Sequence, residues 1–124
     1  MNFITNFLTL QNQLREYHWQ TQKKPGSYAQ HIAFGTAYEE LEPLIDDFIE
    51  IYQGKKGALL AKGNFTIICH NLKDDYVDFI DEFISYLQDN VASSLDSEKD
   101  TDLLNIRDEM MAILNQTKYR LNMM

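Results

Sequence analysis

The sequence has only one cysteine, Cys69, so the chain cannot form a disulfide bond within itself. Its apolar runs are all shorter than the ~20 residues that a membrane-spanning helix requires. The N-terminal residues lack the basic region and the small-residue cleavage site of a secretory signal. These absences predict a cytoplasmic protein, of a cell or of an infected host, that does not contact a membrane.

Histidine is also scarce. The chain has 3 histidines, which excludes an oxygen-carrying di-iron bundle built from many of them, and the Glu-x-x-His spacing of di-iron sites inside bundles does not occur. Its net charge is -8, and neither end carries a lysine-rich tail. Such a surface argues against a nucleic-acid partner. The same acidity either attracts metal cations or simply keeps a small protein soluble.

The chain has only two prolines, Pro25 and Pro43, so long helices are possible. Apolar residues recur at steps of three and four, and this predicts helices over about residues 2–22, 28–53, 66–91 and 97–121. We therefore expect one all-α domain, residues 1–124, folded as a four-helix bundle. Because Pro43 removes a backbone donor inside the second stretch, we expect it to kink or restart that helix.

Turn signals set the expected helix boundaries. Ser27 is a candidate N-cap of the second helix. Ser97, followed three residues later by Asp100, resembles a capping box that would begin the fourth helix. About a dozen residues are left between the second and third helices, and fully extended they reach ~40 Å. That reach is enough for a long crossover but also allows a simple up-down connection.

Two histidines and two carboxylates form a candidate ligand set: His18, His31, Asp46 and Glu50. Their donor types suit Fe(II), and also zinc or manganese. His31 and Asp46 lie ~22 Å apart along one helix, which is too far to share an ion. Asp46 and Glu50 are one turn apart and can share one. His18 can approach His31 across the turn, so a histidine half-site and a carboxylate half-site could be joined by a two-fold partner.

Helical phase predicts that both half-sites lie outside the bundle core. Asp46 and Glu50 lie ~100° to 140° from the apolar stripe around Ile45, and the two histidines lie at stripe edges. Each ligand also has a simpler interpretation, because stripe-edge histidines are often core or interface residues and carboxylates on acidic helices face solvent. The alternative function is therefore a non-catalytic helical bundle that acts through protein contacts.

One segment carries a family resemblance, in the order Tyr17-His18-Trp19, a turn with Gly26, Tyr28, His31, Asp46 and Glu50. It resembles the ferroxidase segment of the Dps proteins, the mini-ferritins that protect DNA in starved cells. The resemblance implies a ferritin-like homo-oligomer in which the histidine half-site of one subunit and the carboxylate half-site of its two-fold mate bind iron and promote Fe(II) oxidation. It also implies that Trp19 takes up an electron, whereas the alternative is an aromatic residue packed at an interface.

The chain departs from the Dps pattern in three ways. The gap between His18 and His31 is one residue longer than in that family. The short helix that family members carry between their second and third helices, and that helps to build the two-fold contact, is missing, as is the lysine-rich tail. Residues 68–74 resemble the entry to the family's third long helix. The chain also looks like short uncharacterised proteins of phages and large DNA viruses, and such a relative could keep the fold and lose the shell.

Overall fold

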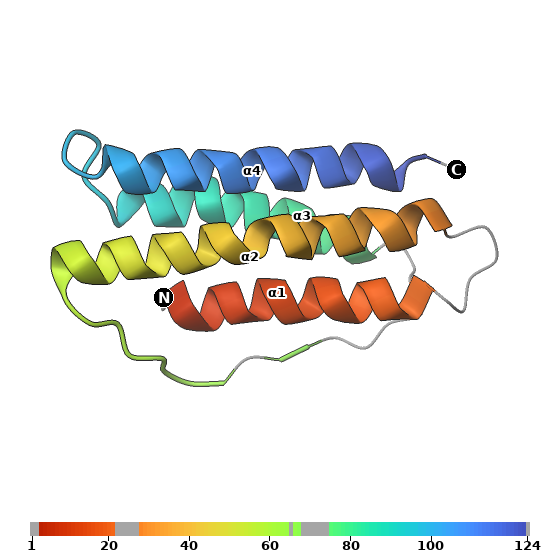
Figure 1. Ribbon diagram of the computed structural model, residues 1–124, viewed down its shortest axis with the longest axis horizontal. Coiled ribbons are helices and arrows are strands. Elements are labelled where there is room, and N and C mark those ends of the chain that lie inside the picture. Colours follow the sequence, from red (N-terminus) through yellow and green to blue (C-terminus); the bar gives the residue numbers. More distant parts are fainter. Residues whose placement is uncertain (1–2, 22–27, 65, 68–74, 124) are drawn as a thin grey trace.

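The computed structural model describes residues 3–21, 28–64, 66–67 and 75–123. Its helices are α1 (Phe3–Gln20), α2 (Tyr28–Lys56), α3 (Asp75–Ser85), the π-helix η2 (Tyr86–Val91) that continues α3, and α4 (Thr101–Leu121). These residues contain no strand. The helices lie side by side along one long axis (Figure 1), which confirms the predicted all-α helical bundle.

Helices α2 and α3 run in the same direction. The side-chain amide of Gln30 donates to the hydroxyl of Tyr76 at 3.0 Å, and this bond joins the starts of the two helices. The chain leaves α2 at one end of the bundle and enters α3 at the other (Figure 1). On the way it passes α1, where the Thr5 hydroxyl donates to the Lys62 carbonyl at 2.8 Å. The connection is therefore the long crossover and not the up-down alternative.

Helix α2 continues through Pro43 as one element, which excludes the restart among the two expectations, a kink or a restart. Proline removes its own amide donor and leaves the carbonyl of Glu39 without a helical partner. Both residues are exposed, so water can hydrate that carbonyl, while the buried Phe48 keeps the next turns on the core. The helix ends at Lys56, and the next residue, Gly57, has a φ of 94° and donates its N–H to the Gln53 carbonyl at 3.0 Å.

The third helix begins later than predicted. Thr66 and Ile67 are not helical, and α3 begins at Asp75. Residues 68–74, with Cys69 and the segment that resembles the Dps helix entry, lie outside the described residues, as does Ser27.

The fourth helix begins at Thr101, so the capping box predicted at Ser97 is wrong. Asp96 folds the preceding residues into a turn, because its carboxylate accepts two of the following backbone N–H groups. Asp100 is the N-cap residue but makes no side-chain capping bond. Its carboxylate instead accepts from the backbone N–H of Asp96 and from Nζ of Lys56, each at 2.7 Å. Long-range charge pairing therefore replaces the local cap.

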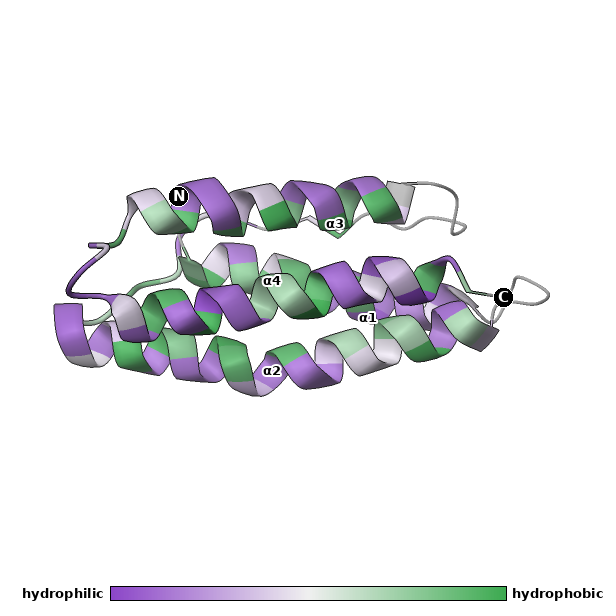
Figure 2. Cartoon of the chain, turned by 90° about the horizontal axis from the view of Figure 1, so that it is seen from above, coloured by the Kyte–Doolittle hydropathy of each residue, from purple (hydrophilic) through white to green (hydrophobic). Residues whose placement is uncertain are grey.

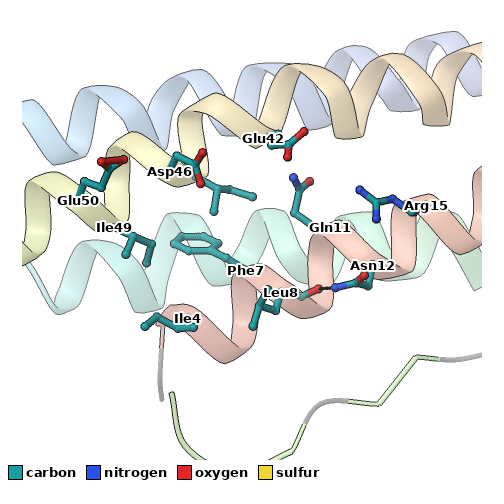
Figure 3. A pocket seen from close by; sticks show the side chains of 11 residues that line it. Ile4, Phe7, Leu8, Gln11, Asn12, Arg15, Glu42, Asp46, Ile49 and Glu50 are labelled. Atoms are coloured by element: carbon teal, nitrogen blue, oxygen red, sulfur yellow. Dashed lines mark hydrogen bonds between the residues drawn. The ribbon is translucent and has the colours of Figure 1, made fainter. Parts of the chain in front are cut away.

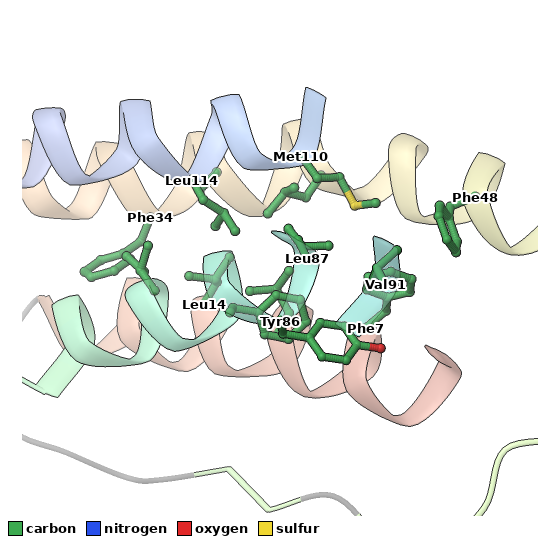
Figure 4. Close-up of a cluster of buried hydrophobic side chains, with 14 of the residues drawn as sticks. Phe7, Leu14, Phe34, Phe48, Tyr86, Leu87, Val91, Met110 and Leu114 are labelled. Atoms are coloured by element: carbon green, nitrogen blue, oxygen red, sulfur yellow. The ribbon is translucent and has the colours of Figure 1, made fainter. Parts of the chain in front are cut away.

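The core forms where the apolar stripes of the helices meet (Figure 4). Helix α2 packs against both α1 and α4. Apolar residues that recur at steps of three and four are buried in every helix: Phe3, Phe7, Leu10, Leu14, Tyr17, Phe34, Leu41, Phe48, Ile80, Phe83, Leu87, Leu103, Met110 and Leu121. Others of the same stripes are partly buried and pack against them: Tyr38, Ile45, Tyr52, Tyr76, Phe79, Ile106 and Ile113. Each large side chain contributes ~1.5–3 kcal/mol when fully buried. Figure 2 shows hydrophilic and hydrophobic residues alternating along the helices, and no helix in the described ranges is long and apolar enough to cross a membrane.

Sequence periodicity does not predict the π-helix η2. Its wider turns alter the backbone pairing at Leu87 and Gln88, whose carbonyls lie 3.3 Å and 3.4 Å from a guanidinium nitrogen of Arg107 on α4. The guanidinium donates to these carbonyls and so joins η2 to the fourth helix. Tyr86, Leu87 and Val91 remain buried in the core.

Candidate metal site

The end of α1 and the start of α2 bring His18 and His31 together, as the sequence predicts. Their imidazole rings stack with centroids 3.9 Å apart and 22° between the ring planes. Both side chains are partly exposed, which agrees with their expected positions at the edges of the apolar stripes. The two histidines therefore form one compact unit near the surface.

Hydrogen bonds fix which ring nitrogens are available. His18 Nδ1 lies 2.8 Å from the main-chain carbonyl of His31, and His31 Nδ1 lies 3.1 Å from that of His18. A carbonyl oxygen only accepts, so this pattern assigns the proton of each neutral ring to Nδ1. Both Nε2 atoms then keep a lone pair. Metal-binding histidines are commonly arranged in this way, with the second ring nitrogen donating to a carbonyl or carboxylate.

Two small residues complete the surroundings of the pair. The hydroxyl of Thr21 lies 2.6 Å from the His18 carbonyl and 2.8 Å from His31 Nδ1, so it donates to the first and accepts from the second. At Gly35, an added Cβ would lie 2.8 Å from Cε1 of His18. The ring of His18 therefore occupies space that any side chain at Gly35 would fill.

Aromatic and basic side chains lie beside the pair. Tyr38 is edge-on to His18, with ring centroids 5.6 Å apart. The guanidinium carbon of Arg15 lies 5.2 Å from the centroid of the Tyr38 ring, within the range of a cation–π contact. Trp19 follows His18 directly and is 63% exposed, so it is not part of the core of a single chain.

Asp46 and Glu50 lie on the exposed side of α2, as predicted from helical phase. Together with Glu42 they form one edge of a groove of about 580 Å³ between α1 and α2 (Figure 3). The opposite edge comes from α1 and includes Arg15. Aliphatic and aromatic residues also line this groove: Ile4, Phe7, Leu8, Ile45 and Ile49. The groove is therefore apolar within and acidic along the α2 side.

One chain does not bring the two half-sites together. His31 belongs to the first turn of α2, and the carboxylates lie several turns further along the same helix. Among the residues that the structure describes, no three His, Cys, Asp or Glu side chains are grouped closely enough to hold a metal ion. A site with all four ligands therefore requires a second chain.

Sequence reasoning missed Thr21 and Gly35. Gly35 could have been noticed, because a glycine inside an apolar helical pattern often marks a close approach of another group. Thr21 gives no such signal, since its role depends on the placement of His31 from the next helix. The sequence identifies ligand types, and the structure adds the residues around them.

The described residues define a crossover-connected helical bundle with two candidate half-sites on its α1 and α2 side. Residues 18–121 match the family model DUF5856, described as a family of unknown function. The chain belongs to this family, and the matched region includes all four candidate ligands. No curated protein and no solved structure matches the chain.

Proposed function

We propose that this chain is a Dps-related, ferritin-like iron-binding protein whose metal site forms between two copies related by a two-fold axis. One copy supplies His18 and His31, and the other supplies Asp46 and Glu50. The arrangement of the histidine pair carries the proposal, because both Nδ1 atoms are held by main-chain carbonyls and both Nε2 atoms keep a lone pair. The crossover between α2 and α3 is also the connection typical of ferritin-like bundles.

The donor set fits iron as a substrate. Two imidazoles and two carboxylates suit Fe(II) and would also accept zinc or manganese. Bound Fe(II) supplies the electrons that reduce peroxide or oxygen, while the four side chains bind and orient the ion. Trp19 follows His18 and is exposed. In this proposal it takes up an electron or packs against the second copy.

The surface formed by α1 and α2 supports a two-fold pairing. These helices run in opposite directions (Figure 1). The histidine pair belongs to the end of α1 and the start of α2, and the carboxylates lie further along α2. A two-fold rotation about an axis across the groove would place the histidine end of one copy over the carboxylate end of the other. The groove residue Leu8 is 42% exposed and would gain burial in such a dimer.

Anaerobic titration with Fe(II), with oligomer mass read on the same sample, tests the proposal. We expect about one or two Fe(II) per chain on a dimer or larger assembly, followed by oxidation when peroxide or oxygen is added. The double variant D46A/E50A should lose this binding and keep its helical circular dichroism. The matched control E40A/D47A removes two exposed carboxylates of the same helix outside the groove, so it should bind as the wild type does.

Two results would overturn the proposal: a sample that is entirely monomeric at micromolar concentration, or Fe(II) binding that D46A/E50A leaves unchanged. No specific iron binding by the wild type would favour a non-catalytic bundle that acts through protein contacts. The groove favours this second function, because its apolar lining and acidic edge fit a basic amphipathic helix of a partner.

A further inference from the structure

We infer that Thr21 and Gly35 position the histidine half-site, by fixing the tautomers and ring orientations that present Nε2 of both His18 and His31. This inference rests on the proposed function for its metal, but its structural part can be tested without one. Neither residue contributes a ligand atom. Both act through the imidazoles that they contact.

Thr21 acts through a single hydroxyl that serves both histidines. It is 1% exposed and lies directly after α1. A hydroxyl has one proton, and the His18 carbonyl at 2.6 Å takes it. The oxygen can then only accept from His31 Nδ1 at 2.8 Å, so that nitrogen must carry the ring proton. The hydroxyl thus couples the end of α1 to the tautomer of a ring on α2.

Gly35 acts by leaving space. With an added Cβ only 2.8 Å from Cε1 and 3.1 Å from Nδ1 of His18, the ring could not keep its place over α2. That place is where His18 Nδ1 donates to the His31 carbonyl at 2.8 Å. A side chain at position 35 would therefore displace the ring and break the bond that assigns its tautomer.

A pair that only stabilised the fold could present either ring nitrogen to solvent. A metal half-site requires the unprotonated nitrogen of both rings to face outward. Here both Nδ1 atoms are bonded to protein atoms, while both side chains are partly exposed. The tautomer therefore reports the positioning of the two rings, and Fe(II) affinity then decides whether that positioning serves a ligand.

The first test uses the metal-free protein. Long-range proton–nitrogen NMR at alkaline pH should show Nδ1–H tautomers for His18 and His31. Thr21→Val keeps the shape but removes the hydroxyl, so His31 Nδ1 keeps only the longer contact with the His18 carbonyl at 3.1 Å and we expect a larger share of the Nε2–H tautomer at His31, whereas Thr21→Ser should restore the wild-type spectrum. With Fe(II) added anaerobically, Thr21→Val should bind ~10- to 100-fold more weakly, and Thr21→Ser should recover most of the affinity.

The second test compares two glycines of α2. Gly35→Ala should displace the His18 ring, change its tautomer signal and weaken Fe(II) binding to a similar extent. Gly54→Ala is the matched control, because a Cβ at Gly54 would meet nothing within 4 Å. It should leave both the tautomers and the affinity unchanged. This pair keeps the inference testable if Thr21→Val fails to fold.

The outcomes separate the two proposals. Wild-type tautomers in both Thr21→Val and Gly35→Ala would overturn the positioning inference, whatever the protein binds. If the variants show the expected tautomer changes but the wild-type protein binds no Fe(II), the positioning inference is supported and the proposed function is rejected. Altered tautomers with unaltered Fe(II) affinity would overturn the link between positioning and metal binding.

Discussion

Asp100, at the start of α4, forms an ion pair with Lys56, at the end of α2, with 2.7 Å between Oδ2 and Nζ. The side chain of Asp100 is only 2% exposed, and Lys55 also contacts its carboxylate, at 3.0 Å. The backbone N–H of Asp96, followed by Lys56 and Lys55, holds the pKa of Asp100 well below its usual range. This cluster joins α2 to α4 at the end of the bundle opposite the histidine pair (Figure 1).

The lowered pKa of Asp100 predicts a loss of stability in acid. A carboxyl whose pKa is lower in the folded state stabilises that state fully above its unfolded pKa of about 3.9. This contribution disappears as the pH falls from there through the folded-state pKa. We therefore expect Asp100→Asn to be less stable than the wild type at neutral pH, with a difference that shrinks below about pH 4.

Urea denaturation at a series of pH values measures this effect. Asp47→Asn is the control for the loss of one carboxylate charge, because Asp47 is exposed on α2. Identical pH profiles for Asp100→Asn and the wild type would show that the ion pair does not contribute to stability.

Local sequence patterns predicted the helices whose apolar residues recur along one segment of the chain, but not the features that depend on contacts between distant segments. The stripe from Phe3 to Tyr17 identified α1 and its buried side, because helical periodicity and burial coincide there. The start of α4 was missed, since the pattern at Ser97 suggests a cap while Lys56, distant in sequence, binds the Asp100 carboxylate. The crossover could not be predicted because residues distant in sequence, such as Gln30 and Tyr76, decide it.

The candidate site also has features that the sequence predicted and features that it could not predict. Spacing placed Asp46 and Glu50 outside the core and allowed His18 to approach His31, and the structure agrees on both points. Residue spacing could not show that the two Nδ1 atoms bond to carbonyls, because those bonds depend on the relative placement of two helices. Thr21 was missed for the same reason.

Phe34 provides a test of core packing. It is fully buried, with its ring centroid 5.3 Å from that of Tyr17 and 5.6 Å from that of Tyr76. Phe34→Ala leaves a cavity between three helices and should lower the free energy of unfolding by ~3–5 kcal/mol. Tyr28→Ala, at a residue that is 76% exposed, should change it by less than ~0.5 kcal/mol. Similar midpoints for the two variants in urea would contradict this packing.

Arg107 provides a test of the π-helix. Its guanidinium donates to the carbonyls of Leu87 and Gln88, and Arg107→Met keeps the unbranched apolar stem of the side chain but removes these donors. We expect a loss of ~1 kcal/mol in stability and faster amide exchange within η2. The control Asp108→Asn weakens only the exposed pair between Asp108 and Arg107 Nε, so it should cost less than ~0.5 kcal/mol. Unchanged exchange in Arg107→Met would show that η2 does not depend on this contact.

The sharing of ligands between two copies predicts complementation. A variant H18Q/H31Q lacks the histidine half-site, and D46A/E50A lacks the carboxylate half-site, so neither should bind Fe(II) alone. A mixed dimer, however, contains one complete site, because each copy supplies the half that the other lacks. Random pairing of equal amounts makes about half of the dimers mixed, so the mixture should recover about a quarter of the wild-type capacity.

The mixture must be unfolded and refolded together, or expressed together, so that the copies exchange. A parallel mixture of D46A/E50A with H18Q/H31Q/D46A/E50A controls for refolding itself, since none of its dimers contains a complete site. Recovery in the first mixture but not in the second requires ligands from two chains. Fe(II) binding by either double variant alone would place the ion at other residues, and a mixture that stays inactive despite proven mixed dimers would exclude the shared site.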